Sequence, residues 1–261
     1  GMALANSSWN LSSIIGPAVA GILIIHLETA GVFYLIVGLY VISSFTISRV
    51  IDGSKSPVQA NSGLTGDIRD GIRYVASNSN LLGLMIIAFI TAMFGMPYIT
   101  LLPAWAREAL NVQSDGLGVL MMTMGLGSLL GTVALASLGN IKRRGDLLIL
   151  SCVLWGVVLA VFSQSTSYQM AIPLLLLIGI VTAIFRTLNM TLMQLNASPE
   201  MRGRVMSMAM MTFGIMPLSA LPFGAISEFW GTPNALLVSG VLLALFTVIF
   251  TFRYPGFRST V

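Results

Sequence analysis

The sequence predicts an all-α fold, a polytopic membrane helix bundle of about eight transmembrane helices. Of its 261 residues, 56% are hydrophobic and only 8% are charged, whereas a soluble domain carries about 25% charged residues. The apolar residues gather in runs that approach the roughly 20 residues a helix needs to cross a bilayer. These runs lack the alternating pattern that is typical of membrane β-strands.

Short spacers separate the apolar runs, except for one longer spacer at 50–80. The predicted spans lie near 9–26, 30–49, 81–103, 116–138, 147–164, 168–193, 205–227 and 234–252.

Prolines and small polar residues interrupt two of these spans. Asn10 and Ser13 precede Gly16 and Pro17 in the first span, and Pro97 interrupts the third. A proline inside a helix removes a backbone hydrogen bond and bends the helix, and broken helices tend to line substrate paths in transporters. These residues are therefore candidates for a substrate path, and a simple packing kink is the open alternative.

Glycines recur inside the fourth predicted span, where Gly125, Gly127 and Gly131 lie close to Ser128. In lipid no hydrophobic effect drives helices together, and small residues let their backbones approach closely. We expect these glycines to mark close helix packing, with a hinge as a secondary possibility.

The distribution of Lys and Arg predicts the orientation of the bundle. Eleven of the 13 basic residues fall in alternate loops and at the tail, which predicts a cytoplasmic side that also holds both termini. Of the other two, Arg107 lies in an opposite loop and Arg186 lies within a span. Trp105, Trp230 and Tyr168 fall at predicted outer ends, where interfacial aromatic residues are expected.

The end of the long spacer predicts a short amphipathic helix along the cytoplasmic surface. Ile68, Ile72 and Val75 recur at spacings of four and three residues, which is the helical period. Asp70 and Arg73 lie on other faces, three residues apart, where they can form a weak pair.

Arg186 is a functional candidate because a charge inside a span is costly. Asn189 follows it by three residues on nearly the same face, and Thr182 precedes it by one turn. The resulting polar stripe predicts a cavity wall or an inner gate. In the structural alternative, Arg186 snorkels toward the inner end of its helix, roughly 10 Å away.

The sequence also argues against several classes of function. It has one histidine and one cysteine, so no intrachain disulfide and no histidine cluster can form. It contains no phosphate-binding loop for ATP, and its acids lie in loops or near helix ends rather than in a deep acid–base constellation. We therefore expect no cofactor, no metal and no enzymatic activity. The basic residues form no single patch, so we expect no nucleic-acid partner.

Four stretches carry a family resemblance. They are NSSWNLSSIIGPAVAG (6–21), GIRYVASNSNLLGLM (71–85), YITLLPAWAREAL with GLGVLMMTMGLGSLLG (98–131) and LNMTLMQLNASPEMRGRVMSM (188–208). On these motifs the chain resembles the drug and siderophore exporters of the major facilitator superfamily, which include enterobactin-type and macrolide-efflux proteins.

The resemblance implies that the chain holds helices 5–12 of a twelve-helix fold. Residues 1–50 are then the last two helices of the N-terminal bundle, 51–80 a cytoplasmic linker with the amphipathic helix, and 81–261 the C-terminal six-helix bundle. Four further helices are expected before Gly1, which would make the chain a fragment. GNIKRRGD (139–146) departs from the family pattern, because Asn140 and Ile141 stand where an acid is expected.

The resemblance further implies a cytoplasmic gate at the basic turns. Arg202, Gly203 and Arg204 form one turn, and Lys142, Arg143 and Arg144 form the other. Both arginines around Gly203 can reach the carbonyl ends of neighbouring helices and carboxylates in other cytoplasmic turns. We expect them to hold the inward side closed.

The function implied is a secondary active transporter of the cell (inner) membrane. It would export a small molecule, drug or siderophore by alternating access, with protons as the driving partner and the bilayer as its solvent. The alternative is a truncated membrane interaction module that does not transport.

Overall fold

The computed structural model describes residues 31, 33–49, 64–112, 114–138, 143–214 and 216–254. Throughout these residues the regular elements are helices, and six helical segments are long and apolar enough to cross a membrane. This confirms the all-α membrane class. The predicted span 9–26 lies outside the described residues, together with Asn10, Ser13, Gly16 and Pro17.

The helices succeed one another with short connections. Their bounds are α2 Leu64–Ser77, α3 Ser79–Ile90, the π-helix η1 Thr91–Gly95, α4 Pro97–Leu110, α5 Ser114–Ser137, α6 Arg144–Ser163, α7 Tyr168–Asn196, α8 Arg202–Phe213, α9 Met216–Trp230 and α10 Thr232–Arg253. A further apolar helix covers Phe33–Ser48, within the predicted span 30–49, and its side chains are exposed.

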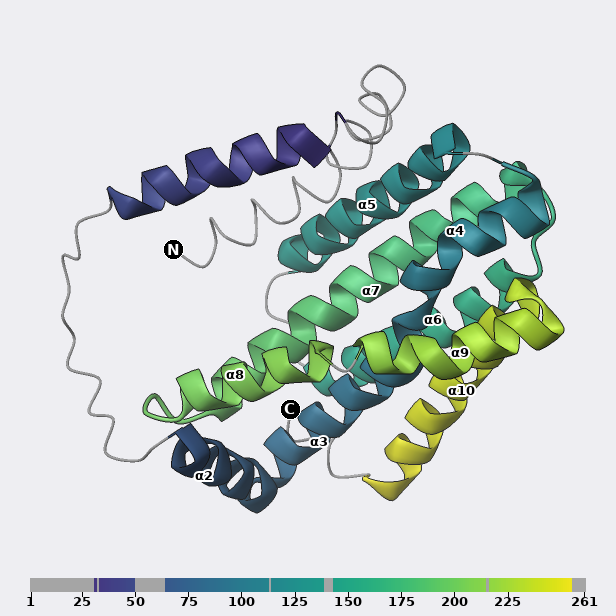
Figure 1. Cartoon of the computed structure of the whole chain (residues 1–261). Helices are drawn as coiled ribbons and strands as arrows, with labels where there is room; N and C mark the ends of the chain where they lie inside the picture. The colour runs from purple at the N-terminus through teal and green to yellow at the C-terminus, as the bar shows by residue number, and fades with distance from the viewer. Residues whose placement is uncertain are drawn as a thin grey trace.

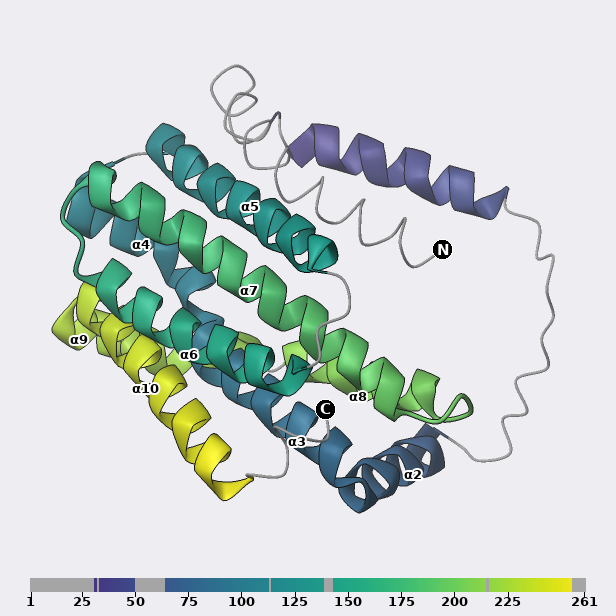
Figure 2. The same ribbon diagram turned by 180° about the vertical axis from the view of Figure 1, so that it is seen from behind.

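Two helix pairs form the most extensive contacts of the bundle, α5 with α7 and α6 with α10. α6 also packs against α7, which links the two pairs. Figure 1 and the reverse view in Figure 2 show α5 and α7 lying side by side, with α2 at the end of the bundle where α3 begins.

Glycines permit the closest of these contacts. A Cβ atom added to Gly127 would lie 2.1 Å from the carbonyl oxygen of Leu176 on α7, and one added to Gly131 would lie 2.4 Å from that of Ile180. From the other side, a Cβ on Gly179 would lie 2.2 Å from the carbonyl oxygen of Met124. These approaches confirm the predicted close packing for Gly127 and Gly131.

The third predicted span is one long segment that is broken near Pro97. The π-helix η1 leads into the break and Pro97 begins α4, so the ordinary helical ladder is interrupted. Hydroxyls from two other helices bond the carbonyls there: Ser219 on α9 donates to Ala92 at 3.3 Å, and Ser239 on α10 donates to Phe94. This matters because an unsatisfied backbone group is costly inside a bilayer.

The predicted span 205–227 lies within one apolar segment, Arg202–Trp230, that is long enough to cross a membrane. This segment holds two helices, α8 and α9, whose described ends are Phe213 and Met216. The structure corrects one detail of the sequence analysis. Trp105 is not an interfacial residue: it is fully buried, and its indole N–H donates to the carbonyl of Ser163 at 3.0 Å. Its position at a predicted helix end gave no sign that α6 would cover it.

The amphipathic helix is present as α2, which contacts α3 and α8. Val75 is buried, whereas Ile72 is 53% exposed. The contact with α8 runs through Gly71, where an added Cβ would lie 3.0 Å from the sulfur of Met208. The helix therefore docks on α8 with one face and leaves Ile72 free on another.

Candidate functional site

A cavity of about 250 Å³ lies inside the bundle, and α3, η1, α4, α5, α6 and α7 all contribute residues to its wall. It brings together Thr182, Arg186 and Asn189, the three polar residues that the sequence places on one stripe of α7. Met96 and Tyr98 also line it, on either side of Pro97. The helix break and the polar stripe therefore meet at one cavity.

Arg186 is the charged residue among the described residues of this cavity wall. Its side chain is exposed. The helix that carries it, α7, ends three residues after the predicted span 168–193. Arg186 thus lies ten residues before the end of the helix, or about 15 Å at 1.5 Å per residue. Snorkelling to that end is harder than the sequence suggests.

Asn189 and Thr182 have local partners. The buried Asn189 amide donates to the carbonyl of Leu84 on α3 at 3.1 Å, which joins α7 to α3. The Thr182 hydroxyl donates to the carbonyl of Gly179 within α7 at 3.0 Å. Both side chains line the cavity and also stabilise its walls.

Trp155 is a cavity residue that the sequence analysis did not single out. Its side chain is fully buried, and its indole N–H has no acceptor among the residues that the structure describes. A buried donor without a partner costs about 1–3 kcal/mol. Nearby, the buried Tyr98 ring packs edge-on against Trp155, and the Tyr98 hydroxyl contacts the Met124 sulfur at 3.1 Å. No sequence pattern around Trp155 distinguishes it from an ordinary apolar packing residue.

A second group of predicted residues lies at the junction of α7 and α8. The Arg202 guanidinium donates from Nε to the carbonyls of Gln194 at 3.1 Å and Ala197 at 3.3 Å, at the C-terminal end of α7. The partial negative charge of a helix C-terminus favours a cation there. Arg202 therefore ties the start of α8 to the end of α7.

Arg204 reaches α2 instead. Its Nη1 lies 3.9 Å from the Asp70 carboxylate, and both side chains are partly exposed. The sequence predicts a local pair of Asp70 with Arg73, but the fold brings Arg204 to Asp70. Gly203 lies between the two arginines, and a Cβ added there would meet nothing within 4 Å.

Tyr74 adds another link between α2 and this junction. The backbone N–H of Ser198 donates to the Tyr74 hydroxyl at 3.0 Å. Hydrogen bonding with Ser198 lowers the pKa of Tyr74 from its ordinary value, because it stabilises the phenolate. The amphipathic helix is thus held to the turn after α7 and to α8.

The other predicted basic turn is described only in part. Arg143 is exposed and immediately precedes α6, which begins at Arg144. Lys142 lies outside the described residues.

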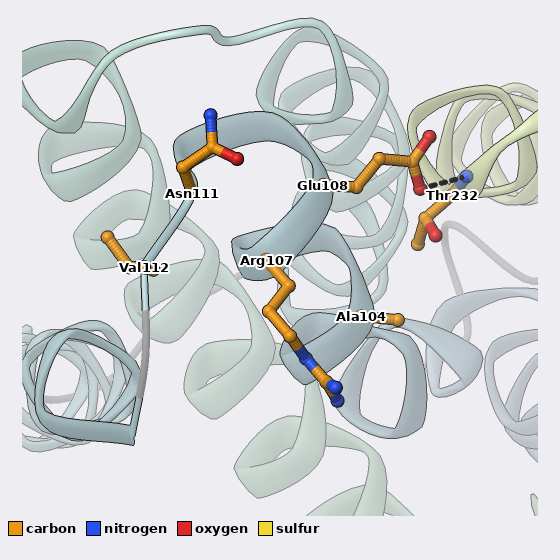
Figure 3. Close-up of a pocket in the computed structure, with 6 residues that line it drawn as sticks. All are labelled: Ala104, Arg107, Glu108, Asn111, Val112 and Thr232. Carbon is orange, nitrogen blue, oxygen red and sulfur yellow. Dashed lines mark hydrogen bonds between the residues drawn. The ribbon is translucent and has the colours of Figure 1, made fainter.

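A second cavity lies between the end of α4 and the start of α10, opposite the junction of α7 and α8 along the helices. Figure 3 shows Glu108 reaching the backbone N–H of Thr232, which donates to its carboxylate at 2.9 Å, whereas Arg107 points elsewhere. The carboxylate caps the N-terminus of α10, where negative charge is favoured.

In the described ranges, His, Cys, Asp and Glu form no group of three or more that could hold a metal ion.

Comparison with known proteins decides the family. A sequence model of the Major Facilitator Superfamily matches residues 1–220. The chain belongs to the Major Facilitator Superfamily. The resemblance predicted from the sequence motifs is confirmed, and so is the class of polytopic membrane protein.

Relatives within the superfamily include named transporters and efflux proteins. The chain is 24% identical over 252 residues to the Staphyloferrin A transporter of Staphylococcus aureus, covering 93% of this chain and 61% of that protein. It is 22% identical over 249 residues to the multidrug efflux pump Tap of Mycolicibacterium fortuitum, covering 94% and 60%. It is 24% identical over 254 residues to macrolide efflux protein A of Streptococcus pyogenes, covering 94% and 62%.

The chain therefore spans about three fifths of the length of these Major Facilitator relatives. The matches cover nearly all of this chain, so the cavity and the junction of α7 and α8 both lie within the shared region.

Proposed function

We propose that the protein is a secondary active transporter that exports a small molecule by alternating access. The observation that supports this is the cavity within the membrane-spanning helices, lined by Arg186, together with membership of the superfamily. Intramembrane charges commonly mark substrate or ion pathways. In this proposal Arg186, Asn189, Thr182 and Pro97 line the substrate path.

The proposed path includes Asn10, Ser13, Gly16 and Pro17 from the first predicted span. Alternating access needs two bundles that rock around a shared site. We assign residues 1–50 to the last two helices of the first bundle, 51–80 to a cytoplasmic linker and 81–261 to the second, six-helix bundle.

We assign a cytoplasmic gate to the basic end of the bundle. Arg202, Gly203 and Arg204 form its centre, and the contacts of Arg202 with α7 and of Arg204 with α2 support this role. Lys142, Arg143 and Arg144 belong to the same gate, at the turn before α6. With this end in the cytoplasm, both termini of the chain lie on the cytoplasmic side of the cell membrane.

Proton-driven efflux is the proposed mode of coupling. The names of the relatives, a siderophore transporter, a multidrug pump and a macrolide efflux protein, support export of a small molecule. They do not favour the alternative of a membrane module that moves nothing.

The test is an accumulation assay in cells that lack their own efflux pumps. Cells expressing the gene product that contains this chain should accumulate less radiolabelled macrolide or siderophore than cells with an empty vector. A protonophore should abolish the difference if protons drive export. Equal accumulation of every tested compound, with the protein shown to be in the membrane, would contradict the proposal.

A further inference from the structure

The internal cavity has two chemically different ends. Arg186 is exposed, whereas Trp155 is fully buried, so the cavity runs from the surface of α7 into the bundle. Trp155 comes from α6, which packs against both α7 and α10. The cavity therefore penetrates the six-helix bundle, and its buried end is built from a helix that carries none of the predicted path residues.

The buried end offers hydrogen-bond donors without strong acceptors. The Trp155 N–H has no acceptor among the described residues. Among the described residues, the acceptor for the Tyr98 hydroxyl is the Met124 thioether, a weak acceptor. Buried indole and phenol groups usually find a polar partner, so these groups are suited to a ligand that supplies one.

Between the two ends, the polar side chains of Thr182 and Asn189 share the wall with larger apolar side chains. Phe185 and Trp155 present aromatic rings, and Met124 and Met190 present flexible, polarisable side chains that adapt to different shapes. None of the described residues that line the cavity is Asp or Glu. The Arg186 guanidinium carries five N–H donors, so it can bond an anionic ligand group beside any partner that it has in the protein. Such a site disfavours an organic cation.

We propose that this cavity is a binding pocket for an aromatic or otherwise apolar acid. The anionic group of the ligand pairs with Arg186, its apolar body lies between Phe185 and the methionines, and an acceptor oxygen at its far end receives the Trp155 N–H. This inference rests on the proposed function for its biological role, because it names the chemical class of molecule carried.

The size of the cavity limits the ligand. Pockets for drug-sized molecules commonly enclose about 300–1,000 Å³, and this cavity encloses about 250 Å³. The cavity therefore holds a small two-ring acid, or one arm of a larger molecule. The remainder of such a molecule would extend past Arg186 and out of the cavity.

The experiment compares matched probes. The gene product containing this chain is reconstituted in lipid nanodiscs, and binding is measured by calorimetry against empty nanodiscs. The probes are 6-methoxy-2-naphthoate, which has an acid and a distal acceptor oxygen; 2-naphthoate, which lacks that oxygen; and the 2-naphthylmethylammonium cation. The variants are Trp155→Phe, Arg186→Gln and, as a control, Trp105→Phe, whose indole N–H already bonds Ser163.

The pocket predicts a pattern across these variants. Trp155→Phe should weaken binding of 6-methoxy-2-naphthoate about fivefold, as expected for one lost hydrogen bond, and leave 2-naphthoate unchanged. Arg186→Gln should weaken both acids about tenfold or more. Trp105→Phe should bind both acids like the wild type, and the cation should not bind above the empty nanodiscs.

Three results would contradict the proposed binding pocket. One is equal binding of 6-methoxy-2-naphthoate by wild type and Trp155→Phe, which would mean that water occupies the indole donor. Another is equal weakening of both acids by Trp155→Phe, which would assign the effect to lost packing. The third is cation binding as tight as acid binding.

The experiments can reject the pocket proposal and the transporter proposal independently of each other. Acid binding with the predicted pattern but without export would support the pocket and remove the transporter proposal. Export that is unchanged in Trp155→Phe, with no acid binding, would support transport and remove the pocket.

Discussion

Two buried tryptophans in this protein differ in whether the indole N–H has a hydrogen-bond acceptor. Trp105 and Trp155 are both fully buried, and each packs against aromatic rings. The Trp105 N–H donates to Ser163, whereas that of Trp155 lines the cavity without a protein acceptor in the described part of the chain. Burial alone would rank them as equivalent core residues.

This difference predicts unequal stability effects. Trp105→Phe and Trp155→Phe both remove the same volume, but only Trp105→Phe also leaves a buried carbonyl without its donor. We expect Trp105→Phe to cost about 1–3 kcal/mol more in unfolding free energy than Trp155→Phe. Thermal unfolding of ligand-free protein in detergent measures this difference. Equal melting temperatures would show that the Ser163 contact adds no stability.

At the scale of elements, the closeness of α5 and α7 depends on glycine. Backbone carbonyls occupy the positions that side chains of Gly127, Gly131 and Gly179 would take. A backbone atom cannot move aside as the end of a flexible side chain can, so the two helices would have to separate. Because α7 carries Arg186 and Asn189, such a separation would also alter the cavity.

We therefore expect Gly127→Ala to destabilise the protein by about 1–3 kcal/mol, the usual cost of overpacking. Gly224→Ala on α9 is the matched control, because a Cβ there meets nothing within 4 Å. That change should be neutral or should stabilise by up to about 1 kcal/mol, since alanine favours a helix more than glycine does. Similar melting temperatures for the two variants would argue against the close α5–α7 contact.

At the scale of the whole molecule, the proposed alternating access depends on how firmly one end of the two proposed bundles is held closed. The Arg204–Asp70 pair is exposed, and exposed pairs contribute about 0–1 kcal/mol. Arg202 bonds two carbonyls at a helix end and benefits from the helix dipole. Arg202 should therefore contribute more to the closed end than Arg204 does.

Replacing both arginines with alanine should raise the inward-open population. Cysteine cross-linking across the cytoplasmic ends of the two bundles measures that population, and the yield should fall when the end opens. Asp70→Asn alone should have a small effect, and Arg73→Ala, an exposed change on α2, should have none. An unchanged cross-linking yield in the double variant would remove the gate assignment.

Much of the architecture could be predicted from the sequence. Apolar runs located five of the six long spans in the described residues to within three residues at each end, because hydropathy and chain length dominate helix formation in lipid. The predicted span 81–103 ends seven residues before the observed segment Ser79–Leu110 does. The stripe of Thr182, Arg186 and Asn189 followed from helical periodicity alone. The roles assigned to these residues stay predictions, as do those of the two basic turns.

By itself, the sequence determined the membrane class, the order of the helices and the family. Only the tertiary structure decided which polar groups meet: Arg204 with Asp70, Asn189 with Leu84, and Ser219 and Ser239 with the carbonyls near Pro97. It also decided that Trp105 has a partner and that Trp155 has none among the described residues. The reason is physical: hydropathy acts along one helix, whereas these contacts depend on the distance and rotation between helices far apart in sequence.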